Sequence, residues 1–113
     1  MTVNRRRGEI SARLDGQDYR LCLTLGALAE LETAFATQDI NALIERFSSG
    51  RLSARDMTAI IGAGLRGGGN ELSDPQVLMM QCEDGAVGFA RIVADLLAVT
   101  FGGPEKSGGG ANP

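Results

Sequence analysis

The stretch GEISARLDGQDYRLCLTLGALAELE, residues 8–32, decides the fold because its apolar pattern changes period part-way along. Apolar and polar residues first alternate on both sides of Asp15-Gly16. This pattern is typical of a β-hairpin with a type I′ turn, which needs positive φ at both central residues. From Thr24, a suitable N-cap, the apolar residues recur at helical spacing. We therefore predict a hairpin followed directly by a helix.

The rest of the chain has the pattern of further short helices. Asp39 and Ser53 each precede an apolar stripe of helical spacing, and Asp56 forms an acidic capping box with Ser53. Ser73 or Asp74 is expected to cap a helix over SDPQVLMMQCEDG, residues 73–85, with Pro75 in its first turn. A last helix is expected over about residues 85–101. The expected core-facing positions are Leu25, Leu28, Leu31, Phe35, Ile40, Leu43, Ile44, Phe47, Met57, Ile60, Ile61, Leu65, Phe89, Ile92, Val93, Leu96 and Leu97.

These segments predict an α+β fold, with an N-terminal β-hairpin followed by about five short helices in a single domain. A chain of 113 residues is long enough to bury a core of its own. We expect a flexible basic N-terminus over residues 1–7, which contains Arg5, Arg6 and Arg7. The domain proper is expected over residues 8–102. Residues 103–113 are expected to form a disordered glycine-rich tail.

Composition argues against several classes of function. The net charge of −3 disfavours binding to nucleic acid or to anionic membranes. Histidine is absent, which excludes Ser-His and Cys-His catalytic pairs and metal sites built on histidine. Cys22 and Cys82 are far apart in sequence, and we interpret them as buried free thiols. No apolar segment is long enough to span a membrane or typical of a secretion signal, so we expect a cytoplasmic protein. Because histidine is absent, we also expect that the protein is not an enzyme and needs no cofactor or metal.

Residues 60–70, IIGAGLRGGGN, contain Gly62, Gly64 and Gly67 in a literal G-x-G-x-x-G order. A dinucleotide-binding turn needs a strand before the first glycine and a helix that opens at the third. Here the glycines come at the end of an expected helix, where the carbonyl groups and the negative end of the dipole repel phosphate. We interpret the motif as a coincidence. Gly62 and Gly64 are expected to allow a bend or the close approach of another helix, and Arg66 to have a structural role in the last turn.

Two segments carry more apolar residues than one side of a helix can hold. In the first, residues 77–80, four apolar residues are consecutive, so this part of the chain is either buried from several directions or partly available to a partner. Adjacent methionines suit adaptable binding surfaces because their unbranched side chains repack readily. The last expected helix has a similar excess. The candidate partner-binding residues are Val77, Leu78, Met79, Met80, Val87, Phe89, Leu97 and Phe101.

Three longer stretches resemble a family of small proteins from the tail-gene clusters of gene transfer agents and related phages. They are RRGEISARLDGQDYRLCLTLGALAELE (6–32), RLSARDMTAIIGAGLRGGG (51–69) and GFARIVADLLAVTFG (88–102). The family is grouped with phage tail assembly chaperones and has also been labelled tail tube protein. The resemblance implies a non-catalytic cytoplasmic protein of alphaproteobacterial type. It would bind the tape measure protein until tube subunits polymerise around it, and no catalytic residues are carried over.

The pattern of elements favours one of the two family labels. Tube subunits build rings from large sheets, which require many segments with alternating polarity, whereas this chain has one hairpin. A chaperone for a long helical protein needs apolar faces that accept amphipathic helices. We therefore expect a tail assembly chaperone whose partner is the tape measure protein or another tail protein, with self-association as a second use of the same faces. The alternative is a structural tail component that is retained in the virion.

Overall fold

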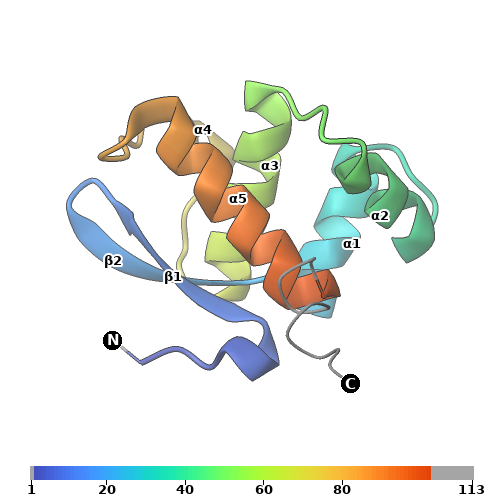
Figure 1. The fold of residues 1–113 in the computed structure, drawn as a ribbon, viewed down its shortest axis with the longest axis horizontal. Helices are drawn as coiled ribbons and strands as arrows, with labels where there is room; N and C mark the ends of the chain where they lie inside the picture. Colours follow the sequence, from blue (N-terminus) through green and yellow to red (C-terminus); the bar gives the residue numbers. More distant parts are fainter. Residues whose placement is uncertain (1, 103–113) are drawn as a thin grey trace, which may run out of the picture.

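The computed structural model describes residues 2–102, in which a short β-hairpin is followed by five α-helices. This confirms the predicted α+β fold (Figure 1). The expected tail over residues 103–113 lies outside the described residues. The elements are the 3-10 turn η1 (Arg5–Arg7), β1 (Glu9–Leu14), β2 (Gln17–Cys22), α1 (Leu25–Ala34), α2 (Ile40–Ser48), α3 (Ala54–Gly67), α4 (Asp74–Leu78) and α5 (Gly85–Phe101).

The hairpin has the turn that its sequence predicts. Asp15 and Gly16 have φ angles of 53° and 75°, so both central residues lie in the left-handed region that a type I′ turn requires. The strands pair antiparallel from Glu9 opposite Cys22 to Leu14 opposite Gln17. The alternate residues of β1 and the end of β2 turn one face of the hairpin into the core.

The first four helices begin at N-caps that the sequence indicates. Thr24, Asp39, Ser53 and Ser73 each accept a hydrogen bond from the backbone amide three residues further along the chain. The capping box between Ser53 and Asp56 is also present. These local bonds satisfy amides that the first helical turn leaves without partners, and they set where each helix starts.

Helix α4 is shorter than expected, because it ends at Leu78 rather than continuing to residue 85. The Met80 amide donates to the carbonyl of Val77 at 3.0 Å, a tight bond that closes the last turn. The chain then turns toward the hairpin tip. There the Gln81 carbonyl accepts from the Asp15 amide, and the Gln81 amide donates to the Asp15 carboxylate, both at 2.9 Å. This tertiary contact replaces the helical continuation that the local pattern indicates.

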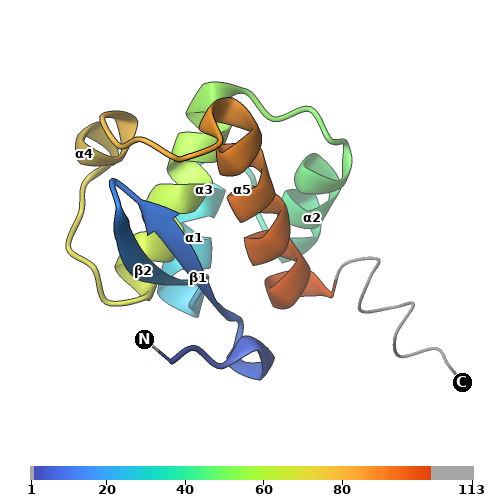
Figure 2. The same cartoon turned by 60° about the vertical axis from the view of Figure 1, so that its left-hand side comes forward.

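The core lies between the hairpin and helices α1, α3 and α5 (Figures 1 and 2). Helix α3 provides its centre, with Ile60, Ile61 and Leu65 almost fully buried. The expectation for Leu25 was wrong, since its side chain is 83% exposed. Leu25 is the first residue of α1, and this helix turns the side that carries Leu28 and Leu31 toward the core instead.

The glycines of the G-x-G-x-x-G stretch allow α3 to pack closely against its neighbours. A Cβ atom on Gly64 would lie 2.7 Å from Cδ2 of Leu96 in α5, so this glycine allows the close helix approach that we expected. A Cβ on Gly67 or Gly68 would collide with the backbone carbonyl of Cys22 or Arg20, respectively. The end of α3 therefore lies flush against β2.

Candidate protein-binding surface

Helix α5 borders two apolar hollows, one on its carboxyl-terminal half and one on its amino-terminal half. The first, which we call the α2–α5 groove, is open and encloses about 570 Å³. Helix α2 turns Leu43 and Phe47 inward, which leaves Ile44 half-buried at the groove. The lining residues are Ile44, Phe47 and Ser48 of α2, and Arg91, Ala94, Asp95, Leu97, Ala98, Phe101 and Gly102 at or after α5.

An aromatic cluster connects α2 to the end of α1 and to the end of α5. The Phe47 ring lies edge-on to Phe35 with centroids 5.4 Å apart, and 6.3 Å from the ring of Phe101. The guanidinium carbon of Arg46 lies 5.4 Å from the centroid of Phe35. Such contacts add about 0.5–1.5 kcal/mol each to the burial of the rings. The apolar wall of the groove is therefore part of what holds α2 in place.

Ion pairs lie at the end of the α2–α5 groove that is closer to the start of α5. Asp95 accepts two hydrogen bonds from Arg5, at 2.6 and 3.0 Å, and these tie the N-terminal turn η1 to α5. Arg91 pairs with Asp84 at 3.0 Å, and both side chains are largely exposed. Exposed pairs of this kind are weak, so they can exchange partners when another chain binds.

The second hollow, which we call the three-helix pocket, is smaller, at about 220 Å³. It lies where the start of α3, the end of α4 and the start of α5 meet. Among the described residues that line it, Thr58 has the only polar side chain. The lining residues are Ala54, Met57, Thr58, Ile61, Val77, Leu78, Met80, Ala86 and Phe89.

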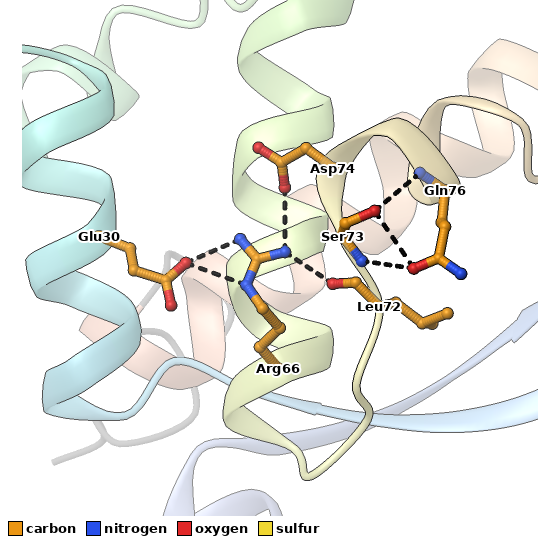
Figure 3. Close-up of polar contacts among 6 residues, drawn as sticks. All are labelled: Glu30, Arg66, Leu72, Ser73, Asp74 and Gln76. Atoms are coloured by element: carbon orange, nitrogen blue, oxygen red, sulfur yellow. Dashed lines mark hydrogen bonds and ion pairs between the residues drawn. The ribbon is translucent and has the colours of Figure 1, made fainter.

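Arg66 binds carboxylates of the chain itself, as Figure 3 shows. Its Nη2 and Nε atoms donate to Oε1 of Glu30 at 2.7 and 3.1 Å, and its Nη1 donates to the Leu72 carbonyl at 2.8 Å. Nη1 also lies 3.1 Å from Oδ1 of Asp74, which occupies space that a Cβ on Gly62 would fill. The hydrogen bond to Glu30 is the main reason that the pKa of Arg66 lies above its ordinary value. The cluster joins α1, α3 and the start of α4, and it satisfies the guanidinium internally.

A comparison with protein families shows to which family the chain belongs. The model of the family described as "Phage tail tube protein, GTA-gp10" matches residues 7–103. The chain belongs to this family. The predicted resemblance is thus confirmed, and the role of the protein is related to phage tails. Searches of curated proteins and of solved structures returned no match.

In this GTA-gp10 family member, the eight candidate partner-binding residues fall into three groups. Val77, Leu78, Met80 and Phe89 line the three-helix pocket. Leu97 and Phe101 line the α2–α5 groove. Met79 and Val87 line neither hollow and are exposed.

Burial differs sharply within the apolar run from Val77 to Met80. The side chains of Val77 and Met80 are 4% and 9% exposed, whereas those of Leu78 and Met79 are 65% and 81% exposed. The sequence left open whether this run is buried or partly exposed. In the structure, two of its residues are buried and two are exposed. Their role in binding stays a prediction.

Sequence reasoning did not select Ile44, Met57 or Ile61, all of which line a hollow of this family member. Each belongs to an apolar stripe of helical spacing, and such a stripe looks the same whether it meets the core or the rim of a groove. Only Ile44 could have been found from the sequence, because α2 has more apolar residues than its core-facing side needs. Leu43 and Phe47 already occupy that side.

In residues 2–102 no group of three or more acidic, cysteine or histidine side chains is placed to hold a metal ion. Over the same residues no helix is long and apolar enough to cross a membrane. Cys22 and Cys82 are free thiols, and burial is the main cause of the raised pKa of Cys22, which lowers its thiolate fraction.

Proposed function

We propose that this protein is a non-catalytic tail assembly chaperone that binds the tape measure protein during tail morphogenesis. The observation that carries the proposal is the pair of apolar hollows along α5, accompanied by exposed Leu78, Met79 and Val87. Amphipathic helices of a partner insert apolar side chains into hollows of this kind. A long helical protein that is not yet enclosed by a tube exposes many such side chains, and covering them prevents aggregation.

A structural tube component is the second candidate, because the family description uses the words tail tube protein. The architecture of the described residues favours the chaperone. Their sheet has two strands, whereas rings of tube subunits are built on larger sheets. The chaperone would act in the bacterial cytoplasm, whereas a tube component would remain in the virion.

The non-catalytic part of the proposal rests on the chemistry of the side chains. The chain contains no histidine, which is the commonest general acid and base near neutral pH. Arg66, which lies in the most connected polar cluster described above, is occupied by Glu30, Asp74 and a backbone carbonyl. These contacts stabilise the fold. Arg66 also borders an open hollow of about 500 Å³ that is lined by residues 69–73, but its guanidinium is already bound by groups of the chain itself.

Co-expression with the tape measure protein tests the binding. The two proteins are expected to co-purify through a tag on this chain, and the tape measure protein should be more soluble than when it is expressed alone. An insoluble tape measure protein that leaves this chain unaccompanied on the column contradicts the proposal.

Mass spectrometry of purified particles separates the two candidates. A chaperone is expected to be absent or present only in traces, because it leaves when the tube subunits polymerise. Copy numbers comparable to those of the ring-forming subunits would instead establish the tube component.

A further inference from the structure

We infer that the three-helix pocket is the docking site for a basic amphipathic helix, one of whose apolar side chains fills the pocket. The inference rests on the proposed function, because it places this helix in the tape measure protein. It adds which of the two hollows is used and which chemistry the partner segment has.

The size and lining of the pocket indicate an anchor side chain. Its volume of about 220 Å³ lies below the roughly 300–1,000 Å³ that is usual for small-molecule sites. Its lining is apolar apart from Thr58. A buried apolar or aromatic side chain of a partner is the usual occupant of such a pocket at a protein interface.

Exposed apolar residues extend the surface beyond the pocket itself. Leu78 lines the pocket and is 65% exposed, and Met79 follows it in the chain at 81%. Val87, 58% exposed, follows the lining residue Ala86 on α5. A helix that lies across the pocket presents anchors at i, i+3, i+4 and i+7, so it contacts a surface wider than one pocket. The unbranched Met79 can adapt to such a partner.

The charge beside the pocket indicates the charge of the partner. The connection between α4 and α5, residues 79–84, has no lysine or arginine and carries the carboxylates Glu83 and Asp84. Asp84 is paired with Arg91 of α5. Glu83 is exposed and has no ion pair within residues 2–102.

The opposite wall of the pocket differs, since α3 carries the exposed Arg55 beside Ala54. The acidic side of the pocket is therefore the connection between α4 and α5. A partner helix gains electrostatic complementarity when its lysines and arginines lie on that side. This charge pattern disfavours a helix whose acidic residues lie on that side.

Fluorescence anisotropy with peptides tests the inference. The probes are fluorescent peptides of about 20 residues, enough for five helical turns, that together cover the tape measure protein. The full chain is expected to bind peptides with an apolar stripe flanked by lysine and arginine. Binding should weaken as salt is raised, because the flanking charges are exposed.

Matched variants locate the site. Leu78→Glu is expected to weaken peptide binding on the order of tenfold, because a carboxylate at the rim opposes burial of the anchor. Glu83→Lys is expected to weaken binding and to reduce its dependence on salt. The control is Leu25→Glu, which places the same charge on another exposed leucine, 83% exposed and outside the pocket lining, and should bind like the unmodified chain.

Each remaining outcome overturns a defined statement. If Ile44→Glu in the α2–α5 groove weakens binding and Leu78→Glu does not, the client uses the other hollow, so this inference fails while the proposed function stands. Selection of acidic peptides by the unmodified chain overturns the partner chemistry alone. If the unmodified chain binds neither the peptides nor the whole tape measure protein, both the inference and the proposed function fail.

Discussion

Gly67 is required by the backbone of a neighbouring strand rather than by its own torsion angles. Its φ does not lie in the left-handed region, yet a Cβ atom at this position would collide with the carbonyl oxygen of Cys22. Gly26 in α1 is different, because a Cβ there would meet only the Thr24 hydroxyl, at 3.8 Å. A larger residue therefore fits at Gly26 but not at Gly67.

We therefore expect opposite effects from the same substitution at these two residues. Gly67→Ala should lower the free energy of unfolding by about 1–3 kcal/mol, because α3 must shift away from β2. Gly26→Ala should raise it by about 0.5–1 kcal/mol, because alanine loses less backbone entropy in a helix. Urea denaturation monitored by circular dichroism measures both. Equal effects of the two variants would show that the contact between α3 and β2 is not as close as described.

Arg66 acts through the shape of its guanidinium group as well as through its charge. A lysine at this position keeps the charge but cannot hold Glu30, Asp74 and the Leu72 carbonyl together, because its ammonium is a single point. Arg66→Lys should lower the free energy of unfolding by about 1–2 kcal/mol. Arg13→Lys is the control, since Arg13 makes one exposed ion pair with Asp18, and it should change stability by less than about 0.5 kcal/mol. Similar urea midpoints for the two variants would contradict a structural role for the cluster.

At the scale of elements, the capping side chains set the helix starts. Ser53 accepts from the Asp56 amide at 3.0 Å, and Asp56 accepts from the Ser53 amide, also at 3.0 Å. Asp56 also pairs with Arg46 of α2 at 3.1 Å. The start of α3 thus contributes both to its own helix and to the attachment of α2.

Removal of this cap should be measurable in the whole protein. Ser53→Ala is expected to cost about 1 kcal/mol in the free energy of unfolding, because the Asp56 amide loses its acceptor. Ser48→Ala on α2 provides a control, because Ser48 is exposed and its side chain makes no hydrogen bond within residues 2–102, so the change should be near zero. Thermal unfolding of both variants in parallel decides the matter, and equal midpoints would show that the cap contributes nothing.

At the scale of the whole molecule, the hairpin tip determines how the run from Val77 to Met80 is divided. The two hydrogen bonds between Asp15 and Gln81 draw the chain away from the helical path after α4. Val77 and Met80 then meet the core, and Leu78 and Met79 remain at the surface. Contacts between segments distant in sequence therefore decide which apolar residues are free to meet a partner.

Aspartate substitutions at the adjacent methionines should separate these environments. Met80→Asp is expected to destabilise the protein by about 3 kcal/mol or more, because it places a carboxylate without a partner in the core. Met79→Asp should change stability by less than about 0.5 kcal/mol, because that side chain is exposed. Urea midpoints measure the difference. A stable Met80→Asp variant would mean that Met80 is available at the surface after all.

The sequence by itself determined the hairpin turn at Asp15-Gly16, the N-caps Thr24, Asp39 and Ser53, and the bounds of the last helix. For the fourth helix it left Ser73 and Asp74 as alternative caps, and the structure has Ser73. Each depends on the torsion preferences and hydrogen bonds of a few neighbouring residues, which a local pattern contains. Only the tertiary structure decided that Leu25 is exposed, that α4 ends at Leu78, and that the eight candidate residues divide between two hollows and the open surface. A side chain is buried only when another element packs against it. The apolar pattern of one helix does not show which element that is, or whether any element covers the residue.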